Sequence, residues 1–68
     1  MPHVESEAIR EIDHDAKTQT LFVRFVDGDW YRYFAVPRAL YDAFRAAESH
    51  GRFFHDHVRD RYEYAKGR

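Results

Sequence analysis

Two runs of strand-forming residues separated by a short turn constrain this chain more than any other feature. The first run is TLFVRFV, Thr20 to Val26, and the second is WYRYFAV, Trp30 to Val36. Both mix β-branched and aromatic residues and alternate along the chain, and the DGD between them is a strong turn signal. The sequence therefore predicts an antiparallel β-hairpin.

The turn decides which residues share a face of this hairpin. A three-residue turn with Gly28 in the left-handed conformation pairs Phe25 with Asp29, Val23 with Tyr31 and Leu21 with Tyr33. A two-residue turn would instead mix arginine into the apolar face, so we predict the three-residue form. One face then holds Leu21, Val23, Phe25, Tyr31, Tyr33 and Ala35, and the opposite face, called the open face below, holds Phe22, Arg24, Trp30, Arg32 and Phe34.

Upstream of the hairpin, the spacing of two isoleucines predicts an irregular first strand. Ile9 and Ile12 fall on opposite faces of a regular strand, and a β-bulge between them would bring both to the same face. We expect this strand to turn back through Asp15 to Thr18.

Two helices are predicted after the hairpin. Apolar residues recur at three and four residues from Leu40 to Ala47, with Ala43 and Phe44 between them, and Pro37 suits the first turn of such a helix. A second short helix should follow, with Ser49 as its N-cap and an apolar side ending near Val58. Because each helix has one apolar face to bury, both should cover the same face of the sheet.

The predicted fold class is therefore α+β: a three-stranded antiparallel sheet followed by two short helices packed on one face. The 68 residues include no cysteine, so the core must rely on six Phe, five Tyr and one Trp rather than on a disulfide. We expect residues 1–68 to form a single domain with its core from about 4 to 64.

Composition favours a cytoplasmic protein without a membrane partner. The first six residues are too polar for a signal peptide, and no apolar run reaches membrane-spanning length. The formal net charge of -1 argues against a strong electrostatic attraction to nucleic acid, although residues 24–68 hold nine basic against seven acidic groups.

Several short motifs occur in a characteristic order. They are Ser6, Ile9 and Ile12 leading to Asp15, then LFVRF, YRY, VP at Val36 and Pro37, and AESHGRFFHDHVR. From about Val4 to Tyr64 the chain resembles the KTSC domain, a short module found at the C-terminus of some lysyl-tRNA synthetases and as a free-standing bacterial or phage protein.

This resemblance implies the small fold derived above, suggests RNA binding and transfers no catalytic residue. Three residues depart from the family's pattern. Asp13 and His14 replace a glycine and a tyrosine, and His55 replaces an asparagine.

The open face suggests a function, because RNA-binding sheets stack unpaired bases on exposed rings while arginines hold phosphates. We predict a non-enzymatic binding module for RNA. The alternative is a protein-interaction or homodimerisation module that uses the same face, or rings that only fill a second small core. The candidate nucleic-acid-binding residues are Arg24, Trp30, Arg32 and Phe34, with Arg52 and Arg59 as auxiliary phosphate contacts.

Metal binding and catalysis receive little support from the sequence. The histidines near the second predicted helix only partly satisfy the spacing of a zinc site, and Ser49 is better explained as a helix cap than as a nucleophile. Gly28 and Gly51 are isolated, so no phosphate-binding loop is indicated. We expect no metal, no cofactor and no catalytic residues.

Overall fold

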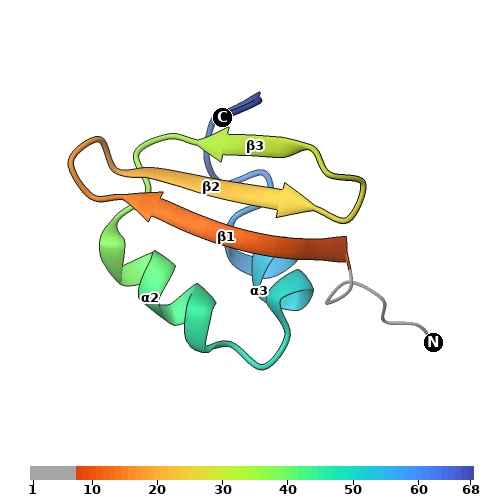
Figure 1. The fold of residues 1–68 in the computed structure, drawn as a ribbon. Helices are drawn as coiled ribbons and strands as arrows, with labels where there is room; N and C mark the ends of the chain where they lie inside the picture. Colours follow the sequence, from red (N-terminus) through yellow and green to blue (C-terminus); the bar gives the residue numbers. More distant parts are fainter. Residues whose placement is uncertain (1–7) are drawn as a thin grey trace.

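The computed structural model describes residues 8–68, in which a small antiparallel sheet carries both helices on one side (Figure 1). The sheet order is β1-β2-β3-β4. The predicted α+β class, with both helices on one face, is confirmed. The elements follow the chain as β1 (Ile9–Asp15), β2 (Thr20–Phe25), β3 (Trp30–Tyr33), α2 (Arg38–Ala46), α3 (His50–His57) and β4 (Tyr64–Lys66).

The sheet has a fourth strand where three were predicted. β4 pairs antiparallel with β3, so that Tyr64 lies opposite Tyr33 and Lys66 lies opposite Tyr31. Just beyond this ladder, the backbone N–H of Gly67 donates to the carbonyl of Trp30 at 2.6 Å. The domain therefore extends past the predicted end of the core at residue 64, while the predicted start at Val4 and the motif residue Ser6 lie outside the described residues.

The hairpin of β2 and β3 has the predicted register. Leu21 lies opposite Tyr33 and Val23 opposite Tyr31. The backbone N–H of Phe25 donates to the carbonyl of Asp29 at 2.9 Å, and Gly28 has φ +96°. This left-handed conformation disfavours side chains with a Cβ, which explains the glycine in the turn.

The predicted bulge in β1 is also present. Ile9 lies opposite Phe25 and Glu11 lies opposite Arg24, so two steps along β1 match one step along β2. As a result Ile9 is buried and Ile12 packs against the same core.

The core lies between the sheet and the two helices. Phe44 of α2 is fully buried and stacks on Phe53 of α3, with ring centroids 5.0 Å apart. Phe54 meets Phe25 and Tyr33 edge to face. The buried residues are Ile9, Leu21, Val23, Tyr33, Val36, Phe44 and Val58.

Two residues predicted on apolar faces are exposed. Ala35 lies beyond the end of β3 with φ +58°, so the alternation of the strand no longer applies to it. Ala43 also faces solvent, and Tyr41 packs against the core beside Leu40 instead.

The helix ends follow local signals. The Ser49 hydroxyl accepts a hydrogen bond from the backbone N–H of Arg52 at 3.1 Å, which is the predicted N-cap. Pro37 is the N-cap residue of α2, one position before the first helical residue. Neither helix within residues 8–68 is long and apolar enough to cross a membrane.

His14, one of the departures from the family's pattern, has a structural role. Its Nε2 donates to the carbonyl of Val36 at 2.8 Å, and its ring stacks on Tyr41 with centroids 5.2 Å apart. The side chain thus joins β1 to the segment that enters α2.

Candidate nucleic-acid interface

Four of the six predicted contact residues lie together on the open face. Phe22 of β2 lies opposite Arg32 of β3, and Arg24 lies opposite Trp30, so rings and arginines alternate across the two strands. The guanidinium carbon of Arg24 is 5.9 Å from the Trp30 ring centroid. The same distance separates Arg32 from the ring of Phe34, which is 40% exposed just after β3.

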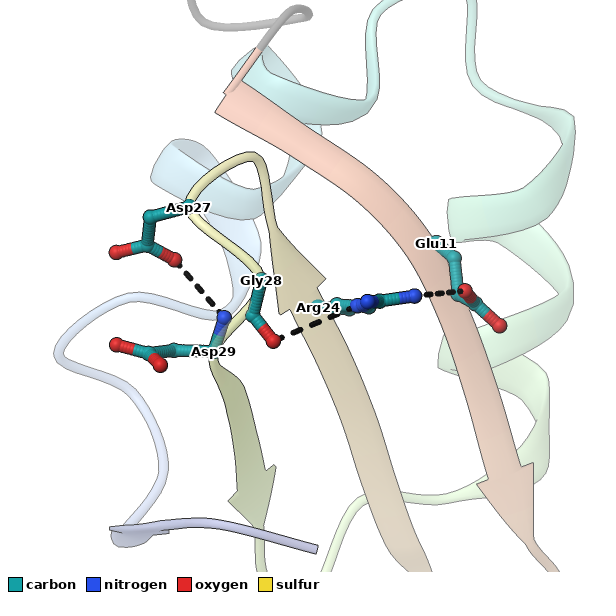
Figure 2. A network of polar contacts seen from close by, with 5 residues as sticks. All are labelled: Glu11, Arg24, Asp27, Gly28 and Asp29. Atoms are coloured by element: carbon teal, nitrogen blue, oxygen red, sulfur yellow. Dashed lines mark hydrogen bonds and ion pairs between the residues drawn. The ribbon is translucent and has the colours of Figure 1, made fainter.

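Arg24 is held across the sheet by groups on both sides. Its Nη1 lies 3.4 Å from Oε1 of Glu11 in β1, and its Nε donates to the carbonyl of Gly28 at 3.4 Å (Figure 2). The Asp27 carboxylate meanwhile accepts from the backbone N–H of Asp29 at 2.9 Å, which fixes the turn that presents this carbonyl. The Arg24 guanidinium is therefore held across the strands, between Glu11 and the β2–β3 turn.

A residue that the sequence did not indicate occupies the centre of the open face. The guanidinium carbon of Arg68 lies 4.4 Å from the Phe22 ring centroid and 4.5 Å from that of Trp30. Its Nη2 donates to Oδ2 of Asp13 at 2.5 Å. This hydrogen bond, aided by the backbone N–H of His14, holds the pKa of Asp13 below its ordinary value.

Arg32 holds the backbone that delivers Arg68. Its Nη1 donates to the carbonyls of Lys66 and Gly67, at 3.3 and 3.2 Å. Within residues 8–68, each arginine of the open face therefore has an intramolecular partner, and no helix packs over these groups. A ligand of this face must exchange those contacts for its own.

The sequence model of the KTSC domain family matches residues 5–62 of this chain. The chain belongs to the KTSC domain family. A crystal structure of a KTSC domain protein from Yersinia pestis superposes with a TM-score of 0.84 at 30% identity, covering 96% of this chain and 92% of that one. The fold and the family inferred from the motifs are thus both confirmed.

Relatives of this KTSC domain occur in chains of very different length. A protein from Tsukamurella paurometabola is 42% identical over 62 residues, which cover 91% of this chain and 92% of the relative. A lysine-tRNA ligase from Trichormus variabilis is 33% identical over 60 residues, which cover 88% of this chain and 11% of the ligase. The domain therefore matches most of one relative and only a small part of the other.

The other two predicted contact residues of the KTSC domain lie away from the open face. Arg52 is an exposed residue of α3, and α3 packs on the covered side of the sheet. Arg59 follows α3 and lines a groove of about 540 Å³ with Tyr31, Tyr33 and Tyr64. The two arginines therefore do not share the open face with the other four predicted residues.

Tyr33 lies at the base of this groove. Burial raises the pKa of Tyr33 to about 12, with neighbouring Tyr64 and Tyr31 acting in the same direction and Arg59 opposing them. Its hydroxyl consequently stays protonated to a higher pH than that of an ordinary tyrosine.

The histidines around α3 make local contacts. His57 packs on Phe53 with ring centroids 4.5 Å apart, and His50 meets Phe44 edge to face and donates from Nε2 to the carbonyl of Arg45 at 3.4 Å. His55 lies beside Asp56 on the exposed side of the helix. Among residues 8–68, no group of three or more His, Cys, Asp or Glu side chains is arranged to hold a metal ion.

Proposed function

We propose that this KTSC domain is a small binding module that binds single-stranded RNA on its open face. The observation that carries the proposal is the stacking of a planar guanidinium on Phe22 and Trp30, at 4.4 and 4.5 Å. A nucleobase is also planar and gains free energy by stacking on aromatic rings. The two rings therefore form a platform of the kind that such a base requires.

The flanking arginines supply the contacts to phosphate. The side chains of Arg24 and Glu11 remain 37% and 49% exposed, and ion pairs this exposed contribute little free energy. Exchanging Glu11 for a phosphate oxygen would therefore cost little, and guanidinium groups bind phosphate in a bidentate manner. Sequence similarity to a segment of a lysine-tRNA ligase supports RNA as the nucleic acid.

A second candidate is a protein partner or a second copy of the chain bound to the same face. Glu11 and Asp13 favour it, because they lower the positive charge that would attract RNA. The exposed ring of Phe34, next to Arg32, adds apolar surface to the same face.

Fluorescence anisotropy with a labelled single-stranded RNA of mixed sequence tests the first candidate. Trp30→Ser should weaken binding about 5- to 150-fold, the loss expected when one base no longer stacks on a ring. The matched control is Tyr64→Ser, which removes a 61% exposed ring beside Tyr33 on the other side of the sheet and should leave the affinity unchanged. Affinity of the parent should fall steeply with added salt.

A different set of results would reject RNA binding. A parent that binds no RNA at low salt, sediments as a dimer and becomes monomeric on Trp30→Ser would reject RNA binding in favour of the second candidate.

A further inference from the structure

We propose that Gly67 and Arg68 form a latch that covers the Phe22 and Trp30 rings in the free domain and must open before a base can stack there. The proposal rests on the RNA-binding function and adds a regulatory element to the same site. It follows from where the chain runs after β4 and from what Arg68 contacts.

Gly67 turns the chain onto the open face. Its φ of +107° is one that residues with a Cβ rarely adopt, and its N–H donates to the carbonyl of Trp30. Arg32 donates to the carbonyls of Lys66 and Gly67 and so ties this turn to β3. The direction in which Arg68 leaves the sheet edge is thereby fixed by the backbone.

From this turn the Arg68 side chain reaches across β3 and β2 to β1. It stacks on one ring from each of the two central strands and ends in an ion pair with Asp13. Phe22, Trp30 and Asp13 thus form a slot that suits a guanidinium group, with two rings below the cation and a carboxylate at its far end. A base and Arg68 cannot occupy the faces of these rings together.

The latch can open readily. The side chains of Arg68 and Asp13 are 39% and 49% exposed, and ion pairs with this exposure are screened by water and salt. Arg68 acts as an internal competitor, so the observed RNA affinity is the intrinsic affinity multiplied by the fraction of molecules that are open.

Fluorescence of the protein measures the latch without any RNA, because Trp30 is the single tryptophan. We compare acrylamide quenching of Trp30 in the parent, Arg68→Ala and Asp13→Asn. Quenching should increase most in Arg68→Ala and to a smaller extent in Asp13→Asn, which keeps the cation but loses its charged anchor. Arg61→Ala is the control, since it removes one positive charge from an exposed turn and should quench like the parent.

The same variants are then titrated with the labelled single-stranded RNA. Arg68→Ala should bind about 3- to 10-fold more tightly than the parent even though it has lost a positive charge, as expected when a mostly closed site becomes fully open. Arg61→Ala should show no gain. Circular dichroism confirms that each variant retains the fold.

Two results overturn the latch. Unchanged quenching in Arg68→Ala would mean that Arg68 does not cover Trp30 in solution. Weaker RNA binding by Arg68→Ala would make Arg68 a contact for RNA rather than its competitor.

Failure of the proposed RNA binding would give a different pair of results. If quenching rises as expected but neither the parent nor any variant binds RNA, then Arg68 does cover the ring, and RNA binding and its gating are both rejected.

Discussion

The two faces of this sheet are built from alternate residues of the same strands and are held together by different forces. On the covered face, Leu21 and Val23 are fully buried against the helices. On the open face, Phe22 lies under Arg68 and Arg24 lies beside Glu11, and both residues are only half-buried. Burial of apolar area stabilises the first face, whereas exposed ion pairs and cation–π contacts organise the second.

This difference separates stability from binding within one hairpin. Contacts on the covered face are expensive to break because no solvent replaces them. Contacts on the open face are individually weak and can be exchanged for those of a ligand. Substitutions on the two faces should therefore affect different measurements.

The largest expected contrast is between two phenylalanines. Phe44→Ala should lower the free energy of unfolding by about 3 to 5 kcal/mol, because it leaves a cavity at the centre of the core. Phe34→Ala removes a ring that is 40% exposed and should cost less than about 1 kcal/mol. Urea unfolding followed by circular dichroism measures both, and similar losses would mean that Phe44 is not the centre of the core.

A smaller contrast is expected between neighbours in β3. Tyr31 packs edge to face on Phe25 with centroids 5.5 Å apart, so Tyr31→Ser should destabilise the domain by about 2 kcal/mol. Trp30→Ser on the open face should stay within about 1 kcal/mol of the parent. Thermal melts of the two variants test this, and an equally unstable Trp30→Ser would show that the open-face rings also serve the fold.

A third effect, confined to alkaline pH, concerns the pH dependence of the covered face. Since the pKa of Tyr33 is raised from 10.0 to about 12, its stabilising contribution is complete below pH 10 and is lost as the pH rises toward 12. The slope in that window is about 1.4 kcal/mol per pH unit for one such group. Urea unfolding at several alkaline pH values should show a steeper loss in the parent than in Tyr33→Phe, and parallel curves would contradict the raised pKa.

Short-range signals made much of the fold predictable. The register of the hairpin followed from Gly28 and the alternation around it, and the β1 bulge followed from the spacing of Ile9 and Ile12. Ser49 marked the start of α3. In each case the decisive interaction joins residues close in the chain or across one strand pair.

The parts that were missed depend on distant partners. β4 is only three residues long, and its YAK sequence has no strand signal apart from its pairing with β3. The contact between Asp13 and Arg68 joins positions 55 residues apart. The seven-residue spacing of Arg52 and Arg59 predicts that both lie on one side of a helix, but it does not say which face of the sheet that helix covers. In the structure Arg59 lies beyond the end of α3.

The outer strands of the sheet limit how copies of this domain can associate. An unpaired strand edge can recruit a strand from another molecule and so extend a sheet indefinitely. Here one edge is β1, which is interrupted by its bulge and carries the charged residues Arg10, Glu11, Asp13 and Asp15. The other edge is the very short β4, where Nζ of Lys66 lies 3.3 Å from Oδ2 of Asp29 in the turn before β3. Among residues 8–68, both outer strands thus disfavour growth by strand addition, so any association between copies is expected at the faces of the sheet.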